Sequence, residues 1–420
     1  MNAIKQLLDW AGPKGIKLNG IAPERIPGRG IGLVATREIQ PKEVILEIPL
    51  ACLRTLETVP KSLVRKLPPK ISVHGLLAAN LALDSTGSQH EAAWNAVCPS
   101  PEDLSTAPLV WPQELQDLLP SAARNLLEKQ KAKYAKDWAG ARPVMEAAAV
   151  VDMTAVAVET QSTTQSEIPQ GGPTQAQQST VDSLEAKYRH AWLLVNTRTF
   201  YYTNAKLKKR NRDDHLALQP VADLFNHTDA DAGEHQGACS VTFDYRGFQF
   251  SATRPYTAGE EVHICYGRHG NDKLLVEYGF AMDGNRWDEV LLDDLLLARL
   301  DDRQKEALEE AGFLGRYALD RDGVCYRTQV AVRQVCCKPG EWRRFVMGAD
   351  DGESSQGEVD GLVLQMLREY LQTAVKVSDK IVTMVAGRPE QRDMLSSRWR
   401  QIQELLRLHI ERLECRVVGT

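Results

Sequence analysis

Long apolar runs, signal-like segments and paired cysteines are the features that this 420-residue sequence lacks. No stretch approaches the roughly 20 consecutive apolar residues that a membrane-spanning helix needs, so the sequence predicts no membrane partner. Residues 1 to 20 show no basic start followed by an apolar run and a small-residue cleavage site, so we expect no secretory signal. The eight cysteines are scattered, and only Cys336 and Cys337 adjoin. Scattered cysteines without a signal peptide are typical of reduced proteins in the cytoplasm or the nucleus.

Several catalytic signatures are absent as well. The nine histidines form no HExxH or other ligand spacing, and no CxxC pair occurs, so the sequence predicts no metal site. GxSxG, P-loop and kinase motifs are missing too. A net charge of −5 and a pI near 6.1 make nucleic acid an unexpected partner. The basic stretch from Lys206 to Arg212 leaves three interpretations open: a local docking patch, a nuclear import signal or a solvated loop.

The composition and the hydrophobic periodicity predict an α+β protein. With 43% hydrophobic residues the chain can bury a large core, and its length predicts two or three units. Strand-like segments fill residues 30–49 and the region after residue 216, with a hairpin turn at Tyr245-Arg246-Gly247. Helical patterns fill the intervening region and the C-terminal part, where two long helices flank Gly387-Arg388-Pro389 as an αα-hairpin. Alternating strand–helix units are missing, which argues against a doubly wound fold.

Residues 150–179 differ from their surroundings in composition. They are rich in Thr, Gln, Ser, Gly and Pro and contain almost no aromatic residue, so the sequence predicts a disordered loop. A helix is expected after it, with Asp182 as N-cap and Glu185 three residues later.

Two short motifs are ambiguous when each is taken alone. The glycine run Gly28–Gly32 is followed by a strand-like segment and not by a helix, so it predicts a tight turn or a close approach of a ligand to the backbone, not a dinucleotide site. The stretch DLFNHT, Asp223–Thr228, contains a glycosylation sequon, but the expected compartment excludes that use. His227 alone is more typical of a structural histidine, and Tyr266 of a packed aromatic residue.

The order of the motifs is far more specific than any one of them. The succession GRGIGLVATREIQPKEVILEIP, a helical insertion, DLFNHT, TAGEEVHICYG and NDKLLVEYGF resembles the SET-domain methyltransferases. The insertion, with HEAAWNAVCPSPEDLSTAPLVWPQEL and YRHAWLLVNTRTFYY, is similar to that of the Rubisco large-subunit lysine methyltransferase branch, which acts on non-histone proteins. The resemblance covers nearly the whole chain except residues 150–179. No cysteine-rich segment follows Gly279, which sets the chain apart from histone-directed SET enzymes.

The resemblance implies a fold and a division into domains. The fold is an α+β SET-domain β-fold with a knot-like cofactor site, a helical insertion and an all-helical C-terminal domain that binds the substrate. The implied boundaries are residues 1–57 for the first part of the SET domain, 58–215 for the insertion with its loop at 150–179, 216–284 for the second part of the SET domain and 285–420 for the helical domain.

The same resemblance implies the cofactor S-adenosylmethionine and a set of site residues. Asn226 and His227 would hold the cofactor, aided by Asp223. Tyr266 would be the active-site tyrosine, which orients the amine and the methyl group. Backbone groups at the glycine run would hold the methionine end, and an aromatic ring would lie beside the adenine; these residues are Arg29, Gly30, Ile31 and Phe280.

The expected substrate is a lysine side chain of another protein. Arg198 and Phe200 match the substrate-binding end of a family helix, and Phe200 is followed by Tyr201 and Tyr202. An aromatic wall favours an alkyl ammonium through cation–π attraction over an imidazole that needs a fixed polar partner. Two alternatives remain open at this point: a histidine methyltransferase on the same fold, and a catalytically silent SET scaffold that only binds a partner. The sequence carries no signal for the oligomeric state.

Overall fold

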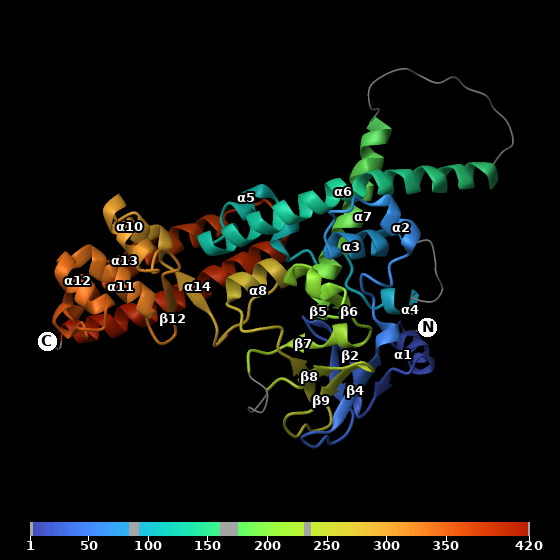
Figure 1. The fold of residues 1–420 in the computed structure, drawn as a ribbon, viewed down its shortest axis with the longest axis horizontal. Coiled ribbons are helices and arrows are strands. Elements are labelled where there is room, and N and C mark those ends of the chain that lie inside the picture. The colour runs from blue at the N-terminus through green and yellow to red at the C-terminus, as the bar shows by residue number, and fades with distance from the viewer. Residues whose placement is uncertain (1–2, 84–91, 160–174, 231–236, 419–420) are drawn as a thin grey trace. The chain divides into compact units, whose positions relative to one another are not determined.

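The computed structural model describes residues 3–83, 92–159, 175–230 and 237–418 (Figure 1). They form two compact units. The first comprises Met1–Leu104 and Lys129–Gly267, and the second comprises Ser105–Glu128 and Arg268–Thr420. These units differ from the boundaries expected from the sequence at two places, because residues 105–128 and residues 268–284 group with the C-terminal segment. Leu115, Leu119 and Leu127 of the first stretch, and Leu275 and Val276 of the second, are fully buried in the hydrophobic core of the second unit.

In the part of the chain that the structure describes, the first unit contains two four-stranded sheets and one two-stranded sheet. One sheet has the order β1 (Lys17–Leu18), β4 (Val44–Pro49), β9 (Gly247–Ser251), β8 (Ser240–Phe243). The other has the order β2 (Ile21–Ile26), β3 (Gly30–Ala35), β10 (Glu261–Ile264), β7 (Asn226–His227). The two-stranded sheet pairs β5 (Thr199–Tyr201) with β6 (Leu216–Leu218). Neighbouring strands in these sheets are antiparallel except β7 and β10, which run parallel.

Two tight turns that the sequence indicates each join a pair of antiparallel strands in the first unit. Strands β2 and β3 pair with Ile26 opposite Gly30, and Gly28 and Gly30 have φ angles of 74° and 77°, which favour glycine. The glycine run is therefore a tight turn, as expected. Strands β8 and β9 pair with Phe243 opposite Phe248, which confirms the hairpin at residues 245–247.

Among the described residues, the helices that contribute to the first unit are α1 (Ala3–Ala11), α2 (Lys61–Lys66), α3 (Val73–Leu83), α4 (Ala92–Asn95), α6 (Ser121–Glu159) and α7 (Gln175–Arg198). Helix α6 begins in the segment assigned to the second unit. Helices α3 and α7 pack side by side (Figure 1). Helix α6 continues to Glu159 and α7 begins at Gln175, so helix occupies both ends of the predicted loop at 150–179. Its middle, residues 160–174, lies outside the described residues. The α6 end is alanine-rich, and alanine is the best helix former, which explains why helix extends there.

A buried histidine joins α3 to α7. The His74 ring is stacked on the Trp192 ring with 4.0 Å between centroids, and its Nε2–H donates to the Trp192 carbonyl at 2.9 Å. Burial lowers the pKa of His74 to about 3, and the nearby Lys133 adds to this effect. At neutral pH the ring is therefore uncharged.

His74 should make the stability of the folded chain depend on pH. The unfolded chain binds a proton at this side chain near pH 6.5, whereas the folded chain does not, so stability should fall by about 1.4 kcal/mol per pH unit as pH drops below about 6.5. Urea midpoints at about pH 7 and about pH 5 measure this slope. His74→Gln, which keeps a donor for the Trp192 carbonyl, should flatten it. The same slope in both proteins would contradict the assignment.

The second unit is mainly helical, as the sequence predicts. Its helices are α5 (Gln113–Gln116), α8 (Asn271–Tyr278), α9 (Asp293–Leu297), α10 (Asp302–Glu310), α11 (Tyr326–Cys336), α12 (Pro339–Val346), α13 (Gln356–Val382) and α14 (Pro389–Val418), and its strands are β11 (Glu289–Leu291) and β12 (Ala318–Asp320). Helices α13 and α14 are the expected αα-hairpin. Among the described residues, no helix is long and apolar enough to cross a membrane.

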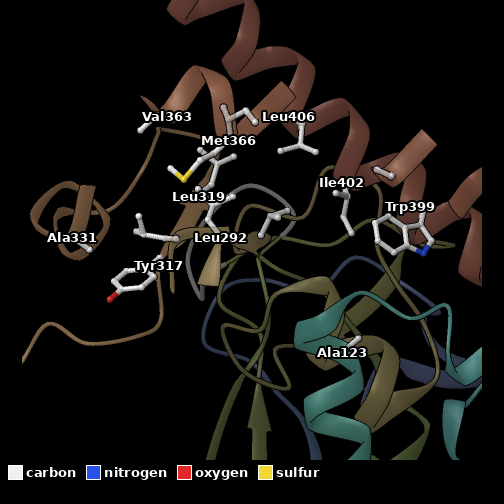
Figure 2. Close-up of a cluster of buried hydrophobic side chains, with 14 of the residues drawn as sticks. Ala123, Leu292, Tyr317, Leu319, Ala331, Val363, Met366, Trp399, Ile402 and Leu406 are labelled. Carbon is white, nitrogen blue, oxygen red and sulfur yellow. The ribbon is translucent and has the colours of Figure 1, made fainter. Parts of the chain in front are cut away.

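One continuous hydrophobic core holds the second unit together (Figure 2). Met366 of α13 and Leu406 of α14 are fully buried within it, together with Leu292 and Tyr317 beside the short sheet. Trp399 is anchored by its indole N–H, which donates to the Leu118 carbonyl at 2.8 Å. The apolar stripes of α13 and α14 therefore face each other and the shorter elements, which is the arrangement that their periodicity predicts.

Candidate cofactor and substrate site

The stretch DLFNHT lies where the first unit combines strands that are distant in sequence. Asn226 and His227 form β7, which pairs in parallel with β10 so that Asn226 lies opposite His263 and His227 opposite Ile264. Just before β7, Ala222–Leu224 form a short 3-10 helix. Because β7 is the last strand of its sheet, its two polar residues lie at the sheet edge.

Tyr266 is held against this edge by three contacts. Its backbone N–H donates to His227 Nδ1 at 3.1 Å, and its hydroxyl donates to the Phe225 carbonyl at 2.6 Å. The Tyr266 and His227 rings are stacked with 5.0 Å between centroids. Since Nδ1 accepts a hydrogen bond, a neutral His227 carries its proton on Nε2. The structure thus brings together Asn226, His227 and Tyr266, which lie up to 40 positions apart in the sequence.

A carboxylate that the motif analysis did not single out completes the group. Glu261 of β10 is mostly buried, and its Oε1 accepts from Asn226 Nδ2 at 2.7 Å. Its Oε2 lies 2.9 Å from Arg29 Nη2 and 3.4 Å from His263 Nε2. Burial by itself raises the pKa of Glu261, but the hydrogen bonds from His263 and Asn226 outweigh it, so the pKa is lowered and the carboxylate is ionised at neutral pH.

The glycine run supplies the wall next to Glu261. A Cβ atom on Gly32 would lie 2.7 Å from Glu261 Oε1 and 3.0 Å from Asn226 Nδ2, so only glycine fits there without a shift. A Cβ on Gly30 would meet nothing within 4 Å. Of the three residues expected at the methionine end, Arg29 joins the site through Glu261, while Gly30 and Ile31 open strand β3. Their contact with cofactor stays a prediction.

Asp223 faces a different environment from Asn226. Its Oδ2 accepts from Trp94 Nε1 at 2.7 Å, and its backbone carbonyl accepts from Arg198 Nη1 at the end of α7. Burial raises the pKa of Asp223, and Arg198 opposes that effect. Asp223 Oδ1 and Arg198 Nε are buried and have no hydrogen-bond partner among the described residues.

Asp223 and Arg198 line a cavity of about 390 Å³ in the first unit. Apolar side chains of α3 and α7 and the Trp94 ring form much of the lining. Arg54 stacks on that ring, with its guanidinium carbon 4.1 Å from the centroid. The cavity therefore offers an aromatic and apolar surface with polar atoms that can still bond to a ligand. The expected role of Asp223 at the cofactor stays a prediction.

Phe200, the first residue of the expected aromatic wall, lies in an aromatic cluster of the first unit, and its contact with a substrate lysine stays a prediction. Phe200 of β5 lies edge-on to Phe250 at 5.9 Å, and Phe225 stacks on Phe250 at 5.1 Å. Because the Phe225 carbonyl accepts the Tyr266 hydroxyl, this aromatic cluster is connected directly to the tyrosine. Tyr201 is half exposed, whereas Tyr202 is buried. Phe280 belongs to the second unit, where its ring lies 6.3 Å from that of Tyr278, and its place beside adenine stays a prediction.

Comparisons with known proteins show similarity along most of the chain. The SET domain family model matches residues 30–267, and the model of the Ribosomal lysine N-methyltransferase 2 C-terminal domain matches residues 289–412. The chain is 31% identical to Ribosomal lysine N-methyltransferase set11 of Schizosaccharomyces pombe over 46% of this chain and 51% of that protein. It is 24% identical to SET domain-containing protein 4 of Mus musculus over 93% of this chain and 86% of that protein.

A solved structure shows the same fold along the whole chain. The structure of Rubisco LSMT bound to AdoMet aligns with 100% of this chain and 93% of its own, with a TM-score of 0.62 and 15% sequence identity. At 15% sequence identity, the structural similarity establishes the fold alone. The α+β architecture with a SET core and a helical C-terminal region is thereby confirmed.

Proposed function

Because the chain belongs to the SET-domain family of S-adenosylmethionine-dependent lysine methyltransferases, we propose that it methylates a lysine side chain of a ribosomal protein. The C-terminal match at residues 289–412 supports this substrate class, since that family model is described from a ribosomal lysine methyltransferase. The similarity to set11 supports it independently, although it covers about half of each chain. A ribosomal substrate would place the enzyme in the cytoplasm or the nucleus, as the cysteine usage led us to expect.

The convergence of Asn226, His227, Glu261 and Tyr266 at one sheet edge is the observation that carries the proposal. The donor set fits the cofactor, because an ionised carboxylate and an amide suit its charged amino-acid end. When bound, S-adenosylmethionine supplies the reactive methyl group. Asn226 and His227 would hold it, and the backbone at Gly30 and Ile31 would line its methionine end.

Tyr266 would act as a neutral hydrogen-bonding group. Burial raises the pKa of Tyr266 to about 12, so its hydroxyl keeps its proton at neutral pH. The Phe225 carbonyl and the stacked His227 ring fix its direction. From there the hydroxyl would orient the substrate amine toward the methyl group, and such positioning lowers the barrier without a nucleophilic residue.

The aromatic cluster and the cavity support a lysine substrate. A lysine must lose its proton before transfer, and its ordinary pKa of about 10.4 falls in a dry apolar site. Phe200 and Phe225 provide apolar surface next to Tyr266. Arg198 Nε and Asp223 Oδ1 are buried without a hydrogen-bond partner among the described residues. They would form hydrogen bonds with the substrate backbone on either side of the lysine.

One labelling experiment tests the proposal. The purified chain is incubated with isotopically labelled S-adenosylmethionine and either ribosomal proteins or ribosome-depleted extract from its own source, and labelled sites are located by mass spectrometry. We expect labelled lysine in the ribosomal fraction. Label only on histidine would favour the histidine alternative, and label only in the depleted extract would exclude the ribosomal substrate. Absence of both label and cofactor binding would favour the silent scaffold.

Removing the charge of Glu261 should weaken cofactor binding. Hydrogen bonds to a charged group contribute about 1.5–3 kcal/mol, so Glu261→Gln should raise the Kd for S-adenosylmethionine roughly tenfold or more. Isothermal titration calorimetry measures the change. Glu260→Gln is the matched control, because Glu260 pairs with Arg254 and Thr257 instead. Equal affinities for the two variants would show that Glu261 only supports the strands.

A further inference from the structure

Two adjacent cysteines and a carboxylate meet in the second unit where helix α11 ends and helix α13 begins. Cys336 is the last residue of α11, Cys337 is its C-cap, and Glu358 lies in the first turn of α13. One ligand atom of each side chain lies within 4.8 Å of the other two. The two Sγ atoms are 3.9 Å apart. Sequence spacing did not indicate this group, because its third member is more than twenty positions away.

The sulfur–sulfur distance fits a tetrahedral metal ion. Zinc binds thiolate at about 2.3 Å, which places two sulfurs of a tetrahedral site about 3.8 Å apart. The observed 3.9 Å is therefore already close to that geometry. Thiolate ligands favour zinc over magnesium and calcium, which bind through oxygen. A carboxylate is an accepted third zinc ligand.

A buried arginine fixes the two helix ends independently of any ion. Arg333, which is 2% exposed, donates through Nη2 to Gln356 Oε1 at 2.7 Å and to the Gly352 carbonyl at 3.1 Å. Its Nε donates to Ser355 Oγ at 3.1 Å. These bonds hold the last turn of α11 against the start of α13. Glu358, two residues after Gln356, is thus kept beside the thiols, and a preorganised site loses little entropy on binding.

In the structure the Cys336 thiol donates a hydrogen bond to the Val332 carbonyl at 3.3 Å. A bound divalent ion would displace the thiol protons, because thiolates are the form that ligates metal.

We propose that Cys336, Cys337 and Glu358 bind one Zn²⁺ ion, with water as the fourth ligand. The ion would join the C-terminal end of α11 to the first turn of α13 and stabilise the second unit. This assignment is independent of the methyl-transfer site, and it differs from the expectation of no metal site drawn from sequence spacing.

Zinc titration of the full chain tests the site. The protein is reduced, stripped with a chelator, freed of it, and titrated with Zn²⁺ in competition with a chromophoric zinc indicator. We expect one tight equivalent for the wild type and none for Cys336→Ser/Cys337→Ser. Glu358→Gln should lose at least the roughly 10- to 100-fold affinity typical of losing a supporting partner. Cys415→Ser, at an exposed cysteine outside the group, is the matched control and should bind as the wild type does.

Two further readouts separate metal binding from a folding defect. Zn²⁺ should raise the Tm of the wild type and leave that of the double variant unchanged, because a ligand of the native state stabilises it. Co²⁺ bound to the wild type should show thiolate-to-metal charge-transfer absorption. This measurement uses the wild type alone, so a folding defect of a variant cannot affect it. Failure of the folded, reduced wild type to bind one equivalent, or equal binding by a folded double variant, would overturn the proposal.

Discussion

Tyr266→Phe should lower kcat for methyl transfer roughly 100- to 1,000-fold, the range for losing one preorganised hydrogen-bond donor. The substitution removes the hydroxyl that donates to the Phe225 carbonyl and keeps the ring that stacks on His227. The backbone N–H that donates to His227 Nδ1 also remains. The affinity for S-adenosylmethionine should therefore stay near the wild-type value.

Single-turnover rates and cofactor titration of the same preparation measure the two effects separately. Tyr256→Phe is the matched control, because it removes another buried hydroxyl of the first unit, one that donates to the Gly237 carbonyl at 3.3 Å. Its methyl-transfer rate should be close to that of the wild type. If Tyr266→Phe retained full activity, or lost cofactor binding in parallel with rate, the orienting role of the hydroxyl would be wrong.

The pH dependence of the rate should follow the substrate and not Tyr266. Because burial raises the pKa of Tyr266 to about 12, its hydroxyl stays protonated near neutral pH and well into the alkaline range. A lysine with an ordinary pKa of about 10.4 loses its proton increasingly as pH rises toward that value. The residual activity of Tyr266→Phe should thus rise with pH as the wild-type activity does.

Arg398→Met should cost about 3–5 kcal/mol of unfolding free energy, the typical loss when one partner of a buried ion pair is removed. The Arg398 side chain has no solvent exposure, and it binds Asp272 Oδ1 at 2.6 Å and Asp288 Oδ2 at 2.7 Å. Burial by itself lowers the pKa of Arg398. The two carboxylates raise it by more than burial lowers it, so the pKa lies above its ordinary value. Without the guanidinium, two nearly buried carboxylates would face each other.

Urea unfolding followed by circular dichroism and tryptophan fluorescence measures the loss. Arg400→Met is the matched control on the same helix, because Arg400 pairs with Asp283 at 3.1 Å through exposed side chains. Exposed pairs contribute about 0–1 kcal/mol, so the control should unfold near the wild-type midpoint. Similar midpoints for the two variants would show that the core of the second unit tolerates the unpaired carboxylates.

Local patterns sufficed for the elements whose formation depends on neighbours in sequence. The β2–β3 turn follows from Gly28 and Gly30, which adopt the positive φ angles that a tight turn needs. The α13–α14 hairpin follows from two long apolar stripes on either side of Gly387. The ordered motifs around Asn226 and Tyr266 then led to the SET-domain fold, which the family match confirms.

Residues that act through distant partners escaped the sequence analysis. Glu261 is 35 positions from Asn226, and Trp94 is 129 positions from Asp223, yet each pair shares a hydrogen bond. The sequence of β10 does show Glu261 next to the buried Val262, as expected for a strand with alternating faces. Such alternation indicates which face of the strand a side chain lies on, but it does not indicate which residue pairs with a charged side chain.

The sequence by itself determined the types of element, the motif order and hence the family, because these depend on periodicity, turn residues and short spacings. Only the tertiary structure decided which side chains meet: Glu261 with Asn226 and Arg29, Asp223 with Trp94, and Cys336 with Glu358. It also decided that residues 105–128 pack into the second unit. The physical reason is that burial and hydrogen bonding depend on distance in space, which chain folding sets independently of distance along the sequence.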